Sequence, residues 1–164
     1  MMHVTKQSHV TKQSQKTALI AEAETLVFRA SLTPKIYRAF EVEDTSSLYE
    51  LAEVIVRAFD FDFDHAFGFY NKLKGNIYDS RIQYELFVDM GESESEARSV
   101  KRTRVDEAFR SVGTKMRFLF DYGDNWEFLV ELIKRKPKEP KVKLPRLLLS
   151  AGKAPTQYPD HDDE

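Results

Sequence analysis

Hydrophobic residues along this chain recur with the period of β-strands in two places. Residues 26–32 and 36–42 alternate apolar with polar positions on either side of Pro34, whose fixed φ suits a turn. Residues 116–122 and 126–132 alternate in the same way around a turn that contains Gly, Asp and Asn. The pattern therefore predicts two β-hairpins, and the second carries the clearer alternation.

A helical period follows the first hairpin. Ser47 and Glu50 have the spacing of a capping box, in which each side chain binds a backbone donor of the first turn. The apolar residues after them fall on one helical face, namely Leu48, Leu51, Ala52, Ile55, Ala58 and Phe59. Residues 82–88 alternate like a half-buried strand, and residues 105–112 predict a short helix. We therefore expect an α+β fold, a mainly antiparallel sheet of about five strands with one long and one short helix packed on it.

The two ends of the chain differ from its middle in composition. Residues 3–8 are repeated without change as residues 9–14, and two polar copies are too few to build a packed repeat structure. We expect a disordered N-terminal tail over residues 1–24, a single domain over residues 25–158, and an acidic mobile tail over residues 159–164.

Composition narrows the classes of function. Cysteine is absent, which excludes disulfides, thiolate metal sites and cysteine nucleophiles. The chain has no run of about 18 apolar residues and no apolar stretch of the kind found in secretion signals. With 25 basic and 27 acidic residues, the formal net charge is -2, so no overall field attracts nucleic acid or anionic lipid. We expect a cytoplasmic protein without a membrane partner, in which nucleic-acid binding requires a local basic patch.

Three motifs resemble one known family, the Ri-plasmid open-reading-frame-three-like proteins. They are Pro-Lys-Ile-Tyr-Arg at residues 34–38, the aromatic and acidic stretch at residues 61–69, and Phe-Asp-Tyr-Gly-Asp-Asn-Trp at residues 120–126. The resemblance extends over residues 26–158. Its members occur on plasmids and beside transposons, so the resemblance implies an accessory protein of mobile-element biology and carries no secure activity.

This sequence departs from the family pattern at three aromatic positions. Phe61 stands where the family often has tryptophan, and Phe67 and Phe128 stand where it has histidines. Only His65 remains of the three histidines in this pattern. Phenylalanine cannot coordinate a metal ion, so the resemblance implies no histidine metal site here.

One group of residues has the types needed for phosphoryl chemistry. Clustered carboxylates with an imidazole can hold Mg²⁺ or Mn²⁺, although such aspartates also cap turns and fix hairpins through backbone amides. The candidate functional cluster comprises Asp62, His65, Asp121, Asp124 and Trp126. Asp64 adds a further carboxylate beside His65. We assign no metal and no cofactor to this cluster.

Basic residues supply candidates for contacts with nucleic acid, because cations near phosphates release counterions. The candidates are Arg38, Lys101, Arg102, Arg104, Lys134, Arg135 and Lys136. Acidic blocks lie near the 101–104 and 134–136 segments, so solvated loops are the alternative interpretation of both. Pro137 and Pro140 predict that residues 134–143 form an extended connector.

Three functions remain open from the sequence. The first is a non-enzymatic accessory or binding module that contacts nucleic acid or a protein partner. The second is a metal-dependent hydrolase or nuclease that uses the Asp/His cluster. The third is a self-associating structural protein whose exposed aromatic strand forms the interface.

Overall fold

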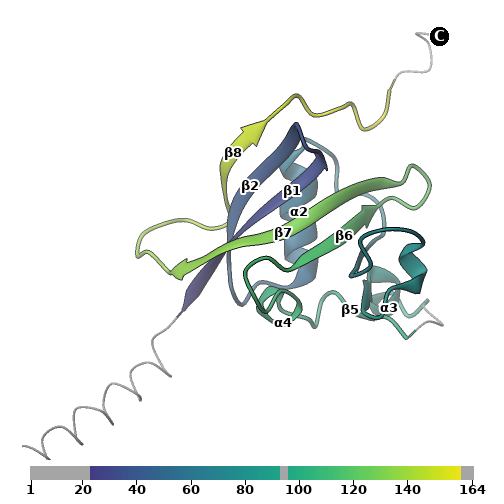
Figure 1. The fold of residues 1–164 in the computed structure, drawn as a ribbon, viewed down its shortest axis with the longest axis horizontal. Helices are drawn as coiled ribbons and strands as arrows, with labels where there is room; N and C mark the ends of the chain where they lie inside the picture. The colour runs from purple at the N-terminus through teal and green to yellow at the C-terminus, as the bar shows by residue number, and fades with distance from the viewer. Residues whose placement is uncertain (1–22, 93–95, 160–164) are drawn as a thin grey trace, which may run out of the picture.

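The structure of the chain, a computed structural model, describes residues 23–92 and 96–159. The duplicated hexapeptide and nearly all of both predicted tails lie outside these residues. Figure 1 shows a sheet with helix α2 behind it, and with the C-terminal strand β8 at one edge. The architecture is α+β, as expected, but its sheet is larger than the sequence predicted.

Eight strands form one sheet in the order β5-β4-β3-β6-β7-β1-β2-β8. Every neighbouring pair is antiparallel except β4 and β5, which are parallel. The strands span Glu24–Thr33 (β1), Ile36–Glu43 (β2), Phe67–Tyr70 (β3), Gln83–Glu85 (β4), Arg98–Ser99 (β5), Lys115–Phe120 (β6), Trp126–Pro137 (β7) and Arg146–Ala151 (β8). The sheet is therefore mixed.

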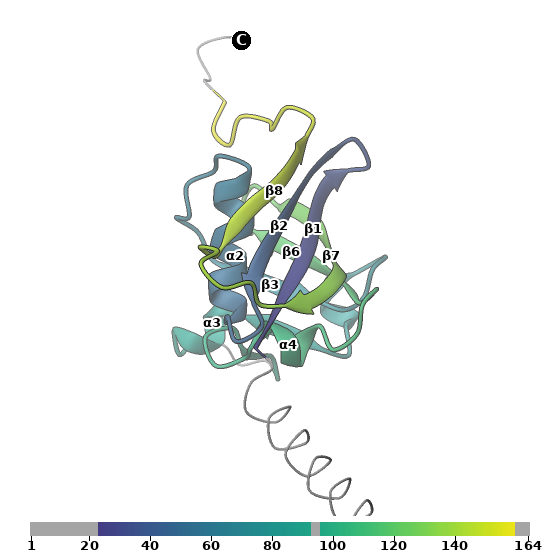
Figure 2. The same cartoon turned by 90° about the vertical axis from the view of Figure 1, so that its left-hand side faces the viewer.

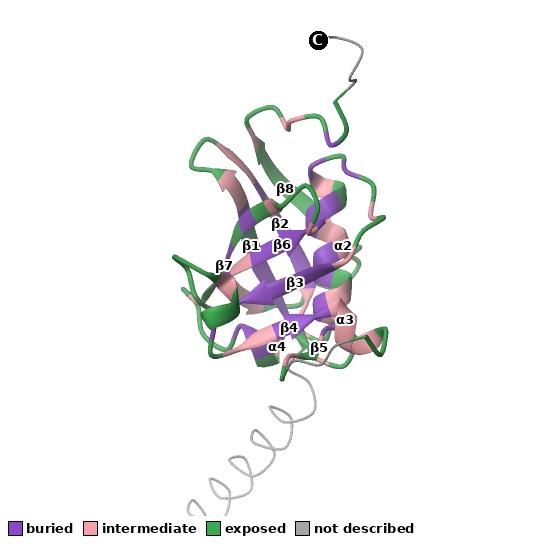
Figure 3. Ribbon diagram, turned by 90° about the vertical axis from the view of Figure 1, so that its right-hand side faces the viewer, coloured by how far each residue is buried: buried purple, intermediate pink, exposed green. Residues whose placement is uncertain are grey.

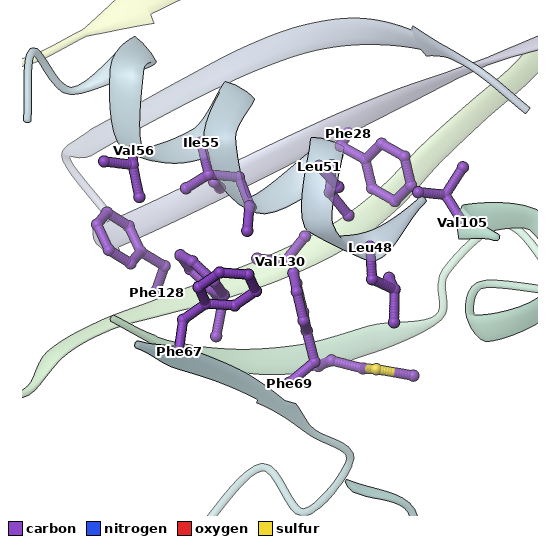
Figure 4. Packing of buried hydrophobic residues seen from close by; sticks show 14 of the residues in the cluster. Phe28, Leu48, Leu51, Ile55, Val56, Phe67, Phe69, Val105, Phe128 and Val130 are labelled. Atoms are coloured by element: carbon purple, nitrogen blue, oxygen red, sulfur yellow. The ribbon is translucent and has the colours of Figure 1, made fainter. Parts of the chain in front are cut away.

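Helix α2, Leu48–Ala58, covers one face of the sheet. It begins where predicted, because the Ser47 side chain accepts a hydrogen bond from the backbone N–H of Glu50 at 3.0 Å. Its apolar stripe meets phenylalanines of β1, β3 and β7, and Figure 4 shows Leu51 and Ile55 pointing toward this group. Figure 3 shows the central strands β3 and β6 buried in the same layer. This contact forms the main hydrophobic core.

The remaining helices are short. They are α3 (Leu86–Asp89), α4 (Val105–Ala108) and the 3-10 helix η1 (Ile77–Asp79). No helix within the described residues is long and apolar enough to cross a membrane.

The prediction of about five strands with one long and one short helix was wrong. Strand β3 was missed because all four of its residues are buried, so it shows no alternation. The predicted strand over residues 82–88 ends at Glu85 and continues as α3. The predicted connector begins inside β7, which extends to Pro137. Strand β8 was missed because three consecutive leucines have no period of two.

The face of the sheet away from α2 contains a buried polar group. The hydroxyl of Tyr70 donates to Oε2 of Glu85 at 2.6 Å and lies 2.8 Å from the hydroxyl of Tyr122. Gly68 lies beneath them, and a Cβ there would approach both hydroxyls to 2.8 Å. Only glycine therefore permits this close packing.

Candidate functional site

Pairing of β3 with β6 brings part of the predicted Asp/His cluster together. Phe67 lies opposite Phe120, so the loop before β3 meets the turn after β6. Nε2 of His65 is 3.5 Å from Oδ2 of Asp121, and Nδ1 of His65 is 2.8 Å from Oδ1 of Asp64. Both ring nitrogens of His65 thus face carboxylates.

This environment raises the pKa of His65 above its ordinary value. The hydrogen bond to Asp64 contributes most, burial acts in the opposite direction, and the charges of Asp121, Asp64 and Asp124 add to the rise. Protonated His65 is the stabilised form, and its two N–H groups are directed at acceptors. This geometry suits a structural cation better than a general base, which needs an available nitrogen.

Asp121 also shapes the turn between β6 and β7. It has a positive φ of 68°, and its Oδ1 accepts hydrogen bonds from the backbone N–H groups of Gly123 at 3.0 Å and Asp124 at 3.2 Å. Its own N–H donates to the carbonyl of Ala66 at 2.9 Å. These are the contacts expected of an aspartate that fixes a hairpin.

Two further members of the predicted cluster, Trp126 and Asp62, have different surroundings. Trp126 packs against Phe61 with ring centroids 4.8 Å apart, and its Nε1 is buried without a hydrogen-bond partner among the described residues. Asp62 binds Gln157 through its backbone, with an N–H donated to Oε1 at 2.6 Å and a carbonyl that accepts from Nε2 at 3.1 Å. Neither the Asp62 carboxylate nor the Trp126 ring bonds to His65 in the described part of the chain.

Sequence reasoning missed the residues that complete this end of the molecule. The Tyr158 hydroxyl donates to Oδ2 of Asp64 at 2.8 Å and lies 3.0 Å from Nδ1 of His65. Burial and the hydrogen bond to Asp64 raise the pKa of Tyr158 to about 12. We call Asp62, Asp64, His65, Gln157 and Tyr158 the C-terminal clasp. The only sequence signal for Gln157 and Tyr158 is that the family resemblance ends at residue 158.

Metal-dependent chemistry finds no support in this geometry. Across residues 23–92 and 96–159, no group of three or more His, Asp or Glu side chains is arranged to hold a metal ion. The carboxylates near His65 instead bind backbone amides, a tyrosine and the imidazole itself.

Most of the basic side chains predicted to contact nucleic acid instead bind groups within the protein. Arg38 is only 6% exposed, and its guanidinium binds backbone carbonyls. Further contacts join Arg104 to Asp106 (2.6 Å), Arg135 to the Arg110 carbonyl (2.7 Å), Lys136 to Glu41 (3.4 Å) and Lys101 to the Tyr49 ring (4.9 Å). Among the seven, only the side chains of Arg102 and Lys134 form no ion pair, ring contact or hydrogen bond with a described residue. Arg102 uses its backbone N–H alone, which donates to Oγ of Ser99 at 3.0 Å.

Strand β8 exposes three consecutive leucines beside a groove. Leu147, Leu148 and Leu149 are 54%, 43% and 51% exposed. Strand β8 pairs with β2 on its inner side, and no described strand pairs with its outer side. Figure 2 looks onto this side of the molecule, with β8 beside α2.

A groove of about 490 Å³ lies between α2 and the start of β8. Its apolar lining comes from Phe40, Tyr49, Val54, Ala58, Pro145 and Leu147. Its charged lining comes from Glu50, Glu53, Arg57 and Arg146, which is two acids and two bases. We call the outer side of β8 together with this groove the β8 edge surface.

A buried carboxylate fastens β8 to the sheet. Glu41 of β2 is 1% exposed, and its Oε1 lies 2.8 Å from Arg146 and 3.4 Å from Lys136. Its Oε2 accepts a hydrogen bond from the Thr25 hydroxyl at 2.5 Å. Burial acts to raise the pKa of Glu41, but the hydrogen bonds from Thr25 and Arg146 and the nearby cations outweigh it and lower the pKa.

Comparison with known proteins agrees with the motifs. A family model described as plasmid pRiA4b ORF-3-like protein matches residues 26–158. A crystal structure of MM3350, a protein of unknown function from Methanosarcina mazei Go1, is similar with a TM-score of 0.65 and 18% identity, covering 84% of this chain and 74% of that one. No curated protein matches. The chain belongs to the plasmid pRiA4b ORF-3-like protein family, and the structural likeness shows a shared fold.

Proposed function

We propose that this plasmid ORF-3-like protein is a non-enzymatic accessory module of mobile-element biology that binds protein through the β8 edge surface. The observation that carries the proposal is an open edge strand of six residues with three consecutive, half-exposed leucines. Unpaired N–H and C=O groups on such an edge readily bind another strand. The occupant that we propose is a second copy of this chain.

Two-fold symmetry makes one strand sufficient for such a contact. Antiparallel pairing of two β8 strands centred on Leu148, the extra residue at which the register between β2 and β8 shifts, sets Leu147 of one copy opposite Leu149 of the other. The leucines then cover one another, and the adjoining grooves provide further apolar surface. No other strand is required for the contact, because each copy contributes its own β8.

The charges of the groove also suit a second copy. A two-fold axis perpendicular to the sheet keeps both α2 helices on one face and runs them antiparallel. Glu50 in the first turn of one helix then lies toward Arg57 in the last turn of the other, while Glu53 pairs with Arg57 of its own helix at 3.4 Å. Equal numbers of acids and bases favour a self-complementary partner over a strongly acidic or basic peptide.

The alternatives have less support. Four of the seven basic candidates are engaged in ion pairs, ring contacts or hydrogen bonds, and Arg38 is only 6% exposed, which leaves little for the phosphates of a nucleic-acid backbone. The aromatic strands suggested as an interface lie in the core, where Phe118 and Phe120 are fully buried. The aliphatic β8 edge surface takes their place in the proposal.

Sedimentation equilibrium over a range of protein concentrations tests the proposal. We expect a species of twice the 19.1 kDa of one chain. Leu148→Lys places two like charges opposite each other, and we expect it to weaken association by at least about 100-fold. Leu73→Lys is the matched control, because Leu73 is also 43% exposed but lies outside the β8 edge surface.

Two results contradict the proposal. One is a wild-type protein that stays monomeric at the highest concentration reached. The other is a Leu148→Lys protein that associates as tightly as the wild type. Either result would exclude a second copy as the partner and leave nucleic acid or a different protein.

A further inference from the structure

A second pocket, of about 590 Å³, lies between the C-terminal segment and the loop that follows α2. Lys153 and the residues up to Tyr158 line one side, and Arg38, Asp60 and Asp62 line the other. Its size is that of a site for a small molecule. The pocket is separate from the β8 edge surface, so its role does not depend on self-association.

Arg38 gives this pocket an incompletely bonded cation. Nε and NH1 donate to four backbone carbonyls, those of Ala58 (3.0 Å), Tyr37 (2.9 Å), Ala151 (2.8 Å) and Gly152 (3.1 Å). The guanidinium carbon also lies over the Phe59 ring, 4.8 Å from its centroid, but no described carboxylate pairs with the guanidinium and no described residue accepts a hydrogen bond from NH2. A guanidinium is always charged and has five donors, so the N–H groups of NH2 remain for a carboxylate to accept.

The pocket also contains two carboxylates that have no partner among the described residues. Asp62 uses only its backbone to bind Gln157, and its carboxylate forms no ion pair or hydrogen bond within the described residues. The same holds for the carboxylate of Asp60, whose backbone has a positive φ of 60°. With Lys153, the pocket carries two cations and two anions. A simple anion would be attracted by Arg38 and repelled by the aspartates.

We propose that this pocket binds a small zwitterion, a free α-amino acid. The carboxylate of the ligand accepts hydrogen bonds from NH2 of Arg38, and its ammonium group lies with the carboxylates of Asp60 and Asp62. Both ends then make charge-assisted hydrogen bonds, which are stronger than neutral ones. The C-terminal clasp holds one wall of the pocket in place through Gln157 and Tyr158.

Titration of glycine and L-alanine into the full chain tests the proposal by calorimetry and by tryptophan emission. Trp126 is the only tryptophan, and it packs on Phe61, the residue between Asp60 and Asp62. We expect saturable binding of the amino acids. Acetate and methylamine, which each carry one half of the ligand, should bind at least about tenfold more weakly.

A charge-removing variant separates the two halves of the site. Asp62→Asn keeps the backbone contacts with Gln157, so we expect the fold to be retained and amino-acid affinity to fall about tenfold. Affinity for acetate should not fall. Asp79→Asn in η1 is the control and should bind like the wild type, because Asp79 lies outside the pocket.

The proposal is overturned by any of three results. They are the absence of saturable binding with either amino acid, acetate binding as tight as that of glycine, or an Asp62→Asn protein with unchanged affinity for glycine. None of these results bears on the sedimentation test, so the two proposals fail independently.

Discussion

The two edges of the sheet are built differently. Strand β5 at one edge has only two residues, and Asp89 beside it accepts hydrogen bonds from the Ser99 hydroxyl and from the N–H of Val100. Strand β8 at the other edge has six residues, with three leucines open to solvent. Very short edge strands resist pairing with other chains, whereas long apolar edges invite it. The contrast locates the expected contact surface at β8.

Side-chain contacts hold the inner side of β8 to β2 at both ends of the strand. Glu41 and Arg146 join its start to β2, and Arg38 binds the carbonyls of Ala151 and Gly152 at its end. A strand held on one side is preorganised for pairing on the other, which lowers the entropy lost on association. Substitutions that weaken the contacts between β8 and β2 should therefore also make β8 less ready to pair with a second copy.

Gly152→Ala should have the largest effect. Gly152 has a positive φ of 76°, and a Cβ would approach the Lys35 carbonyl oxygen to 2.5 Å. Alanine therefore combines backbone strain with a clash against backbone, and we expect unfolding free energy to fall by about 2–4 kcal/mol. Urea denaturation measures this loss, and hydrogen exchange should show β8 released first.

Gly91→Ala is the matched control for this prediction. Gly91 has a φ of 73°, and no atom lies within 4 Å of the position that a Cβ would take there. Only the backbone strain applies at this residue, so we expect a loss of about 1 kcal/mol. Equal losses for the two variants would show that the contact between Gly152 and Lys35 has no role in holding β8.

Glu41→Gln should have the next largest effect. It removes the charge that faces Arg146 and Lys136 within a buried site. We expect a loss of about 2–3 kcal/mol, less than for a fully buried pair because Arg146 reaches solvent. Glu43→Gln, on the same strand, breaks an exposed pair with Lys138 and should cost less than about 1 kcal/mol.

The acid limb of the stability curve gives a second measure of Glu41. Its pKa in the folded protein lies below the ordinary value of 4.5, so the folded state releases the proton more readily than the unfolded state. The resulting stability is present above pH 4.5 and is lost as pH falls through the lower, folded pKa. Glu41→Gln should flatten this part of the curve, and an unchanged slope would assign the loss to other carboxylates.

The sequence predicted the parts of this fold whose signals are local. The second hairpin alternates cleanly, and α2 begins after Ser47 because the Ser47 side chain accepts a hydrogen bond from the backbone N–H of Glu50 in the first turn. Strands β3 and β8 lack alternation. All residues of β3 are buried, so both of its faces are apolar, whereas the leucines of β8 are exposed on both faces of the strand. Such strands are defined by their neighbours in space.

The candidate site divides in the same way. His65 and Asp121 are far apart in the sequence, and they meet because Phe67 pairs with Phe120. That register depends on the whole sheet, so no local pattern could place the two side chains together. The turn-forming role of Asp121, by contrast, follows from residues beside it, Gly123 and Asp124.

The pH response of the C-terminal clasp should be the smallest effect. His65 has a folded pKa above 6.5, so protonation stabilises the folded state below pH 6.5, and this contribution is lost as pH rises through the folded pKa. Asp121→Asn keeps an oxygen for the turn but removes a charge near Nε2. We expect NMR titration to show the pKa of His65 moving down toward its ordinary value, with less than about 1 kcal/mol lost in stability because the ring is partly exposed. An unchanged His65 titration would mean that Asp64 alone holds the imidazolium, and that the segment following β8 is fastened independently of the β6–β7 turn.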